Sequence, residues 1–273
     1  MEQDMHASGI VIIRGGGDLA TGVIQKFHRS GFRLLVLEKE KPSAIRRTVA
    51  LCEAVYTGNA QVEDVCCTRI ESLSELDGCF KRAQVPILVD PGAESIAQLK
   101  PAAVIDAILA KRNLGTHKDM APVTIALGPG FCAGVDVSAV IETNRGHDLG
   151  RLILKGSAQN DTGIPGEIGG KGAQRVIHAP AAGELRHIRS IGDVLEEGEA
   201  ICEINGEVIM APFKGLLRGL IREGLQVPRG MKIADMDPRL DVDWRTISDK
   251  ARCLGGAALE AFYYLTYHRK EKK

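Results

Sequence analysis

Gly9-Ile-Val-Ile-Ile13, followed directly by Arg14-Gly-Gly-Gly-Asp-Leu-Ala20, is the stretch that decides the fold. Its first five residues form a short, continuous apolar run, which is typical of a strand buried on both faces. Apolar residues then recur at helical spacing from Leu19 to Phe27, and Gly31 ends the pattern. A buried strand, a glycine turn and a helix predict the first unit of a parallel sheet with helices on its faces.

Further short apolar runs extend this α/β pattern through the first half of the chain. A capping-box sequence, Ser72-Leu-Ser-Glu75, predicts a helix that continues to about Arg82. We expect strands at Arg33–Leu37, Ala54–Tyr56, Val85–Asp90, Ala102–Asp106 and Val123–Leu127, and an antiparallel pair from the segments 135–141 and 151–155. These elements predict a Rossmann-like domain with a mostly parallel sheet over residues 1–156.

The composition limits the classes of partner. Thirty-five Lys and Arg residues balance 35 Asp and Glu residues, and aromatic residues make up only 4% of the chain. A neutral chain with few stacking side chains predicts neither nucleic-acid binding nor attraction to a membrane surface. The apolar runs are too short to span a membrane or to form a signal peptide after the polar residues 1–8. Seven cysteines without a Cys-x-x-Cys motif predict a cytoplasmic protein with reduced thiols.

The glycine turn is the principal candidate site. Gly15, Gly17 and Ala20 match the pattern G-x-G-x-x-G/A, and Glu38 follows at the end of the next strand. The predicted cofactor-binding segment comprises Gly15, Gly16, Gly17, Asp18, Leu19 and Ala20, together with Glu38. Backbone N–H groups at the helix N-terminus would bind phosphate, and the acid would bind ribose hydroxyls. The alternative is a tight turn without a ligand, because Asp18 would repel an incoming phosphate.

Two other segments are candidates for the same pocket. Gly128-Pro129-Gly130 follows the last parallel strand, at the edge where open α/β sheets bind ligands. Arg46 and Arg47 would lie early in a helix near that edge and could hold a phosphate or a pterin-like anion. The alternatives are an ordinary turn for the glycines and a solvated face for the arginines.

An internal repeat marks a second part of the chain. Residues 157–173 are rich in glycine and predict a linker. After a shift of 32 residues, the segment 176–186 lies over 208–218, with its Pro and Gly in register. Two such copies should pack on each other. The region 174–238 therefore predicts an all-β unit like a biotinyl/lipoyl-type barrel-sandwich hybrid, without the carrier lysine. Residues 239–273 predict a C-terminal helix, capped by Ser248, and a charged tail.

No catalytic residue and no metal site is predicted. The sequence contains no HExxH motif, no Cys/His ligand spacing and no G-x-S-x-G elbow. These patterns leave open whether the chain is an enzyme.

Several unusual motifs extend over nearly the whole length. They are Ile13-Arg-Gly-Gly-Gly-Asp-Leu-Ala-Thr-Gly22, Ala44-Ile-Arg-Arg-Thr-Val49, Lys111-Arg-Asn-Leu-Gly-Thr-His-Lys-Asp-Met-Ala-Pro122, Leu127-Gly-Pro-Gly-Phe131, Pro165-Gly-Glu-Ile-Gly-Gly170 and Thr246-Ile-Ser-Asp-Lys250. With these motifs the chain resembles the YqeB-type accessory proteins of selenium-dependent molybdenum hydroxylases, a family similar to the XdhC/CoxI maturation factors.

The resemblance implies a role in maturing a xanthine- or purine-dehydrogenase-like enzyme. Its implied partners are the hydroxylase apoenzyme and a small-molecule cofactor, either the molybdenum cofactor (a pterin) or an NAD-like dinucleotide. The β unit and the C-terminal helix would present surface to that apoenzyme or to a second copy of the chain. The alternatives are an NAD-dependent oxidoreductase that uses the glycine loop, and a non-catalytic scaffold.

Overall fold

The computed structural model describes residues 9–161, 163 and 166–270. Residues 1–8 and Pro165 of the predicted motif lie outside this part. The largest sheet has nine strands: β1 (Val11–Arg14), β2 (Leu34–Glu38), β3 (Asn59–Val62), β4 (Val65–Ile70), β5 (Val85–Val89), β6 (Ala103–Asp106), β7 (Val123–Leu127), β8 (Ala139–Ile141) and β9 (Leu152–Ile153). The α-helices are α1 (Asp18–Arg29), α2 (Ala54–Thr57), α3 (Leu76–Lys81), α4 (Ser95–Leu99) and α5 (Asp249–Lys270).

Short 3-10 helices complete the regular structure. They are η1 (Arg47–Val49), η2 (Leu51–Glu53), η3 (Leu73–Glu75), η4 (Lys118–Met120) and η5 (Ala173–Arg175). The predicted capping box is present, because Ser72 and Glu75 exchange hydrogen bonds at the start of η3. Each satisfies a backbone donor that the first turn leaves without a partner.

The large sheet is mixed. Its strand order is β3-β4-β5-β2-β1-β6-β7-β8-β9, and the seven strands from β4 to β8 pair in parallel. The outer strands β3 and β9 pair antiparallel with β4 and β8. Parallel pairing brings the carboxyl ends of β1, β2, β6, β7 and β8 to the same edge, and this edge positions the candidate site.

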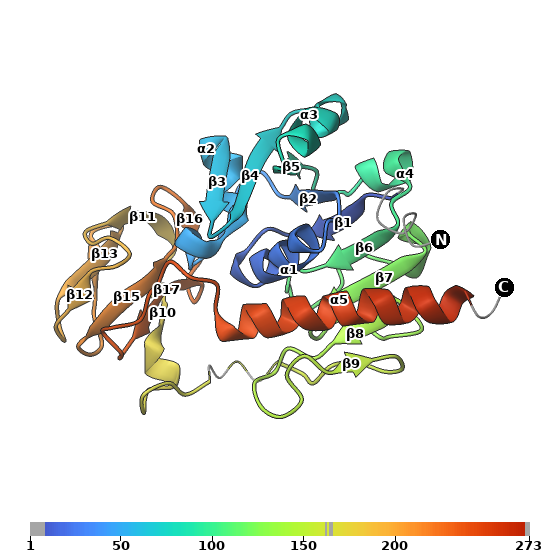
Figure 1. The fold of residues 1–273 in the computed structure, drawn as a ribbon. Helices are drawn as coiled ribbons and strands as arrows, with labels where there is room; N and C mark the ends of the chain where they lie inside the picture. The colour runs from blue at the N-terminus through green and yellow to red at the C-terminus, as the bar shows by residue number, and fades with distance from the viewer. Residues whose placement is uncertain (1–8, 162, 164–165, 271–273) are drawn as a thin grey trace. The chain divides into compact units, whose positions relative to one another are not determined.

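Helices cover both faces of this sheet (Figure 1). On one face, α1 and α5 lie side by side, and a phenylalanine from each, Phe27 and Phe262, meet with ring centroids 5.8 Å apart. On the other face, Ile12 and Val104 pack with Leu76 of α3 and Ile96 of α4. Alternate side chains of each central strand are therefore buried on opposite faces, as the continuous apolar runs predict.

The repeat forms two smaller antiparallel sheets. The first copy supplies β10 (Val176–His178), β11 (Gly183–His187), β12 (Val194–Leu195) and β13 (Ala200–Ile204), and the second supplies β14 (Glu207–Met210), β15 (Gly215–Leu220), β16 (Gln226–Val227) and β17 (Lys232–Asp237). The strand orders are β10-β17-β15-β12 and β14-β13-β11-β16. Each sheet therefore takes two strands from each copy, so neither copy could bury its apolar face alone.

The fold class predicted from the sequence is wrong. In place of a Rossmann-like, mostly parallel sheet with a separate barrel-sandwich-hybrid unit and a terminal helix, the chain has a mixed sheet with antiparallel strands at both edges, and two further antiparallel sheets. The last helix, α5, packs on α1 of the large sheet and continues to Lys270; residues 271–273 lie outside the described part.

One strand prediction is wrong and one hairpin was missed. Ala54–Thr57 is the helix α2, although its β-favouring residues predict a strand. The chain after α2 forms the outer strands β3 and β4 of the sheet, which pair as a hairpin. Glu63 in its turn has a φ of +51°. The turn has neither Gly nor Asn, so the usual hairpin signal is absent from the sequence.

The chain forms two compact units. Unit 1 comprises residues 1–42, 50–161 and 247–273, and unit 2 comprises residues 43–49 and 162–246. Both units use more than one stretch of the chain, whereas the four segments predicted from the sequence (1–156, 157–173, 174–238 and 239–273) are each continuous. In unit 2, Ile45 accepts a hydrogen bond from the backbone N–H of Leu220 (2.9 Å), which ties residues 43–49 to β15.

Candidate functional site

The glycine turn joins β1 to α1 at the carboxyl edge of the parallel strands. Gly15 has a φ of +94°, and a Cβ atom there would lie 3.0 Å from Cα of Ile108. Glycine is therefore required at this position both by its left-handed conformation and by the close approach of the segment after β6. Around Gly17, by contrast, a Cβ would meet no atom within 4 Å.

Carboxylates of the chain itself occupy the donors of this turn. Glu38 accepts hydrogen bonds from the backbone N–H of Gly16 through Oε2 and of Lys39 through Oε1, both at 2.9 Å. Asp18 accepts from the N–H of Leu19 at 2.8 Å. These N–H groups of the turn therefore have acceptors within the chain, and the cofactor-binding role of Gly15 to Ala20 and Glu38 stays a prediction.

The surroundings of the turn are acidic. Burial raises the pKa of the Cys52 thiol, and the carboxylates of Glu38, Glu53 and Asp18 raise it further. The N–H of Cys52 donates to the carbonyl of Gly16 at 2.8 Å. The thiol beside the turn is therefore neutral and poorly nucleophilic, and the acidic surroundings repel an anion at this point of the edge.

A buried polar group lies between the ends of β1 and β6. Arg14 donates to Oγ1 of Thr116 at 2.5 Å, and Thr116 donates to Oδ2 of Asp106 at 2.5 Å. Arg14 also reaches the carbonyl of Leu114 at 3.2 Å. Burial raises the pKa of Asp106, although its hydrogen bonds with Thr116 and the N–H of Ile108, and the charge of Arg14, act in the opposite direction.

The hydrogen bonds of Arg14, Asp106 and Thr116 hold the segments after β5 and β6 in place. Their polar atoms are therefore already engaged within the chain. Sequence reasoning missed this group. The available signal was a charged residue, Arg14 or Asp106, at the last position of two buried apolar runs.

The second glycine segment also lies at the carboxyl edge, directly after β7. The N–H of Gly128 donates to the carbonyl of Ile141 at 2.8 Å. Gly130 has a φ of +104°, and a Cβ there would lie 2.6 Å from Cα of Arg112. Gly128-Pro129-Gly130 thus packs against the segment that follows β6, and both segments lie along the carboxyl edge of the sheet.

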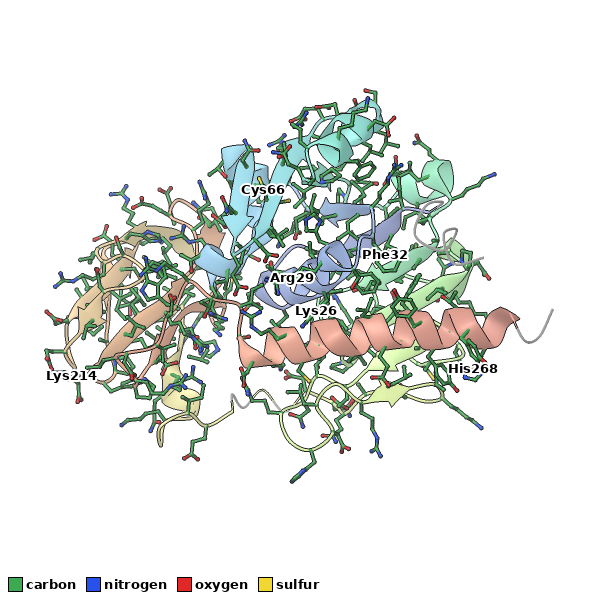
Figure 2. All side chains as sticks on the ribbon, viewed as in Figure 1. Lys26, Arg29, Phe32, Cys66, Lys214 and His268 are labelled. Carbon is green, nitrogen blue, oxygen red and sulfur yellow. The ribbon has the colours of Figure 1, made fainter. Side chains whose placement is uncertain are left out.

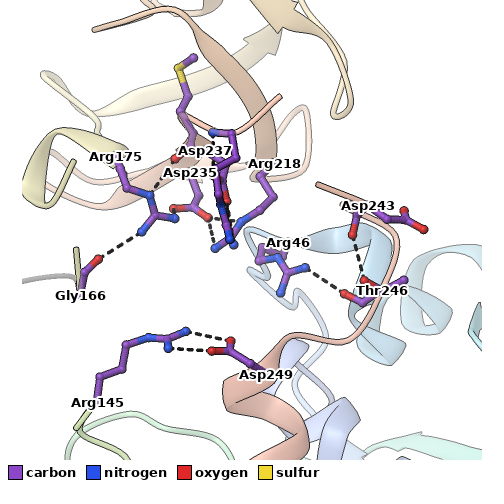
Figure 3. A network of polar contacts seen from close by, with 12 residues as sticks. Arg46, Arg145, Gly166, Arg175, Arg218, Asp235, Asp237, Asp243, Thr246 and Asp249 are labelled. Carbon is purple, nitrogen blue, oxygen red and sulfur yellow. Dashed lines mark hydrogen bonds and ion pairs between the residues drawn. The ribbon is translucent and has the colours of Figure 1, made fainter. Parts of the chain in front are cut away.

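The arginine pair belongs to unit 2. Arg46 donates to the carbonyl of Thr246 at 3.1 Å, as Figure 3 shows, and Nε of Arg47 donates to the carbonyl of Leu220 at 2.7 Å. In place of the longer helix expected here, the short 3-10 helix η1 begins at Arg47, and its segment belongs to unit 2 and packs against β15. The anion-binding role of Arg46 and Arg47 stays a prediction.

Unit 2 also holds a buried network of ion pairs (Figure 3). Arg218 pairs with Asp235 at 2.7 Å and with Asp237 at 3.3 Å, and Arg175 pairs with Asp235 at 3.4 Å. Burial lowers the pKa of Arg175, while Asp235 raises it. Each charge has an opposite partner, so the network links β15, β17 and the segment before β10.

Lys250 is a cation of unit 1 that has no partner among the described residues. It lies half-buried in the first turn of α5, which begins beside the start of α1. Among the residues that the structure describes, no hydrogen bond or ion pair reaches its ammonium group. Burial lowers the pKa of Lys250, and Arg145 lowers it further, whereas Asp18, Asp161 and Glu142 act to raise it.

The neighbouring charges, in contrast, are engaged elsewhere. Arg145 forms two hydrogen bonds with Asp249, at 2.9 and 3.0 Å. Asp161 forms an ion pair with Lys111. Glu142 is buried and accepts from three backbone N–H groups, those of Thr143, Asn144 and Gln159, each at 2.7 Å. A half-buried ammonium surrounded by satisfied charges is suited to bind an anionic group.

The described residues contain neither a metal-binding cluster nor a membrane-spanning helix. In that part of the chain, no three His, Cys, Asp or Glu side chains come together in a way that could hold a metal ion. Likewise, no helix between residues 9 and 270, gaps aside, is both long and apolar enough to cross a membrane.

The comparisons with known proteins give one close curated relative. The chain is 49% identical over 270 residues to a protein of Escherichia coli described as "Uncharacterized protein YqeB", and the match covers 98% of the chain and 50% of that protein. The chain thus spans about half the length of this curated relative. No protein-family model matches the chain.

The solved structures that resemble the chain do so weakly. An aspartoacylase family protein from Mesorhizobium loti has a TM-score of 0.25 at 12% identity, with 79% of this chain and 60% of that one covered. A succinylglutamate desuccinylase from Silicibacter has a TM-score of 0.25 at 10% identity, with 84% and 85% covered. The ectoine utilization protein EutE from Ruegeria pomeroyi has a TM-score of 0.23 at 11% identity, with 78% and 61% covered. Scores this low assign no activity to the chain.

These comparisons correct the prediction made from the sequence motifs. The curated relative is described only as uncharacterised and not as an XdhC- or CoxI-type maturation factor, and no family model matches the chain. The predicted resemblance to those factors is therefore wrong, and so is the role in molybdenum hydroxylase maturation that depended on it.

Proposed function

We propose that unit 1 binds a small molecule with a carboxylate or phosphate group at the carboxyl edge of its parallel strands, and that Lys250 contacts this group. The observation that carries the proposal is the half-buried ammonium of Lys250, which has no hydrogen bond or ion pair among the described residues. Ligands of open α/β sheets bind outside the carboxyl ends of the strands, which is where this lysine lies.

The helices of unit 1 support an anion at the same edge. The helices α1 and α5 both begin there, and the N-terminus of a helix carries a partial positive charge. The glycine segments Gly15–Ala20 and Gly128–Gly130 would then shape the walls of the site, while Lys250 would supply the charge. In this proposal the glycine turn is a rigid support and not a phosphate-binding loop.

A direct binding measurement tests this proposal. We would titrate the protein by calorimetry with inorganic phosphate, acetate, NAD and isolated molybdenum cofactor under anaerobic conditions. NAD and the molybdenum cofactor stay in the set because both carry phosphate and both remain predictions as ligands. We expect saturable binding of at least one probe, weakened about tenfold or more by Lys250→Met, since one charge-assisted contact contributes roughly 1.5–3 kcal/mol.

A matched variant controls for a general change in charge. Lys100 is exposed in unit 1 and lies before β6, at the amino ends of the strands, so Lys100→Met should leave the affinity unchanged. Equal affinities of the Lys250→Met variant and the wild-type protein would refute the proposal.

The remaining expectations about cell location and partners are part of the same proposal. We infer a cytoplasmic protein with a small-molecule partner, without nucleic acid. All seven cysteines are free thiols, which supports a reducing compartment.

A further inference from the structure

A second hollow lies at the opposite edge of the large sheet, at the amino ends of β2 and β5. Its volume is about 710 Å³, and the ends of α1 and α3 border it. Volumes of 300 to 1,000 Å³ are typical of small-molecule sites in proteins. The hollow is built from residues that the first proposal does not use.

Aromatic rings form the apolar part of the hollow. Phe32 is buried at 6% exposure, and its ring packs 5.3 Å from that of Phe27 and 5.0 Å from that of Phe262, measured between centroids. Figure 2 labels Phe32 beside α1. Phe80, the last aromatic residue of α3, is half-buried and lines the same hollow. Phe32 therefore forms a rigid base of the hollow, and Phe80 supplies the ring that a planar ligand can reach.

Positive side chains surround these rings. The guanidinium of Arg33 lies 5.5 Å from the ring centroid of Phe80, and Lys81 and His28 also line the hollow. Asp77 is the acidic residue of the lining. Within the described part of the chain, no hydrogen bond or ion pair engages the side-chain polar groups of these four residues. The guanidinium of Arg33 and the ammonium of Lys81 are therefore available to a ligand, and they outnumber the single carboxylate.

We propose that this hollow binds an aromatic anion: a planar ring that stacks on Phe80 and carries one carboxylate or sulfonate toward Arg33 and Lys81. A ring over Phe80 would lie next to the guanidinium, which already occupies part of that face, and would gain both stacking and cation–π contact. One negative charge fits better than several because Asp77 borders the site.

Three probes separate the ring from the charge. Naphthalene-2-carboxylate has both features, cyclohexanecarboxylate has the anion without the aromatic ring, and 2-naphthylmethanol has the ring without the anion. We would measure their equilibrium binding to the whole protein by fluorescence and calorimetry. Naphthalene-2-carboxylate should bind at least about fivefold more tightly than the other two, since losing about 1 kcal/mol reduces affinity about fivefold.

Variants assign the binding to this hollow. Arg33→Glu, Lys81→Glu and Phe80→Leu should each weaken binding of naphthalene-2-carboxylate about fivefold or more. Lys41→Glu introduces the same charge change at an exposed position outside the hollow and should have no effect. Phe80→Leu retains apolar volume, and a thermal melt of each variant confirms that it is folded.

Two outcomes would overturn the assignment. One is affinity for naphthalene-2-carboxylate that does not change in the Arg33→Glu and Phe80→Leu variants while both remain folded. The other is equal affinity for 2-naphthylmethanol, which would show that the anion does not contribute. Neither outcome bears on Lys250, because Arg33 and Phe80 border the amino ends of β2 and β5 and not the carboxyl edge.

Discussion

Lys250 combines two features, an ammonium without a partner among the described residues and a pKa below the ordinary lysine value. Burial is the main cause of the lowered pKa, because it disfavours the charged form. Binding of an anion would favour the charged form. Affinity should therefore be full at neutral pH and fall as the pH rises through the pKa of Lys250.

The lowered pKa of Lys250 predicts how anion affinity depends on pH. In wild-type protein, anion affinity should begin to fall at a pH below the ordinary lysine pKa of about 10.4, whereas Lys250→Arg should keep its affinity to higher pH, because arginine stays protonated. Calorimetric titrations at a series of alkaline pH values, with circular dichroism to confirm folding, would measure the difference. Parallel pH profiles for the two proteins would contradict this prediction.

Glu38 is the residue whose role differs most from the one its position in the sequence suggests. An acid about 20 residues after a glycine turn is typical of ribose binding, but here both oxygens accept backbone N–H groups of the chain itself. The predicted strands on either side of the glycine turn and helix are present, and Glu38 ends the second of them. The direction of the carboxylate could not be predicted, because it depends on how closely β1 and β2 bring Gly16 and Glu38 together.

Glu38→Gln tests that role. A glutamine can accept from only one of the two N–H groups, so we expect a loss of about 0.5–1.5 kcal/mol in the free energy of unfolding, the net contribution of one hydrogen bond. Glu40→Gln, at an exposed position two residues later, should change the stability by less than about 0.5 kcal/mol. Urea denaturation of both variants gives the comparison, and equal stabilities would show that Glu38 does not hold the turn.

Asp90 illustrates the same use of an acid at a strand end. Burial acts to raise the pKa of Asp90, but hydrogen bonds from the side chain and N–H of Ser95 and from the N–H of Glu94 outweigh it and hold the pKa below the ordinary value. The stabilisation is therefore present above the ordinary aspartate pKa and is lost as the pH falls through the lowered value.

Asp90→Ala should consequently cost about 1 kcal/mol at pH 7, as the loss of a helix cap does. The difference from wild-type protein should shrink when unfolding is measured at progressively lower pH, below about 4. A difference that stays constant with pH would assign the effect to packing and not to the carboxylate.

At the scale of elements, the contact between α1 and α5 organises unit 1. A Cβ atom at Gly255 would lie 2.3 Å from the carbonyl oxygen of Gly22, so the two backbones touch where the helices cross. The amphipathic pattern of α1 predicts that one face is buried, but nothing local indicates that the covering element lies more than 200 residues later in the chain. Long-range pairing of this kind depends on backbone contact, which leaves glycine as its only trace in the sequence.

Neighbouring glycines of α5 offer a matched test. Gly255→Ala should destabilise the protein by about 1–3 kcal/mol, because the new methyl group overlaps the backbone of α1. Gly256→Ala, where a Cβ meets no atom within 4 Å, should stabilise the helix by about 0.5–1 kcal/mol. Thermal unfolding of the two variants should thus shift in opposite directions, and shifts of the same sign would argue against the close crossing.

At the scale of the whole molecule, the chain leaves unit 1 for unit 2 twice and returns each time. Residues 43–49 leave unit 1 early and complete unit 2, where Ile45 packs against the apolar core and Nε of Arg47 donates to the carbonyl of Leu220. The internal repeat could be read directly from the sequence. The contribution of residues 43–49 could not, because a seven-residue segment carries no periodicity that identifies its partner.

A truncation would measure this contribution. Residues 162–246 expressed alone lack Ile45 and Arg47, so we expect them to be less stable than the same unit within the whole chain. Adding a synthetic peptide of residues 43–49 should raise the melting temperature of the fragment in a concentration-dependent manner. A fragment whose melting temperature does not respond to the peptide would show that unit 2 is complete without it.

The exchange of strands between the two copies of the repeat has a consequence for how such a unit could arise. A free peptide of one copy could build both four-stranded sheets only by meeting a second, identical peptide about a two-fold axis, since each sheet needs two strands from each copy. A precursor of unit 2 would then be a symmetric dimer. The link at Asn205-Gly206 would have fused its two chains and made a concentration-dependent association permanent.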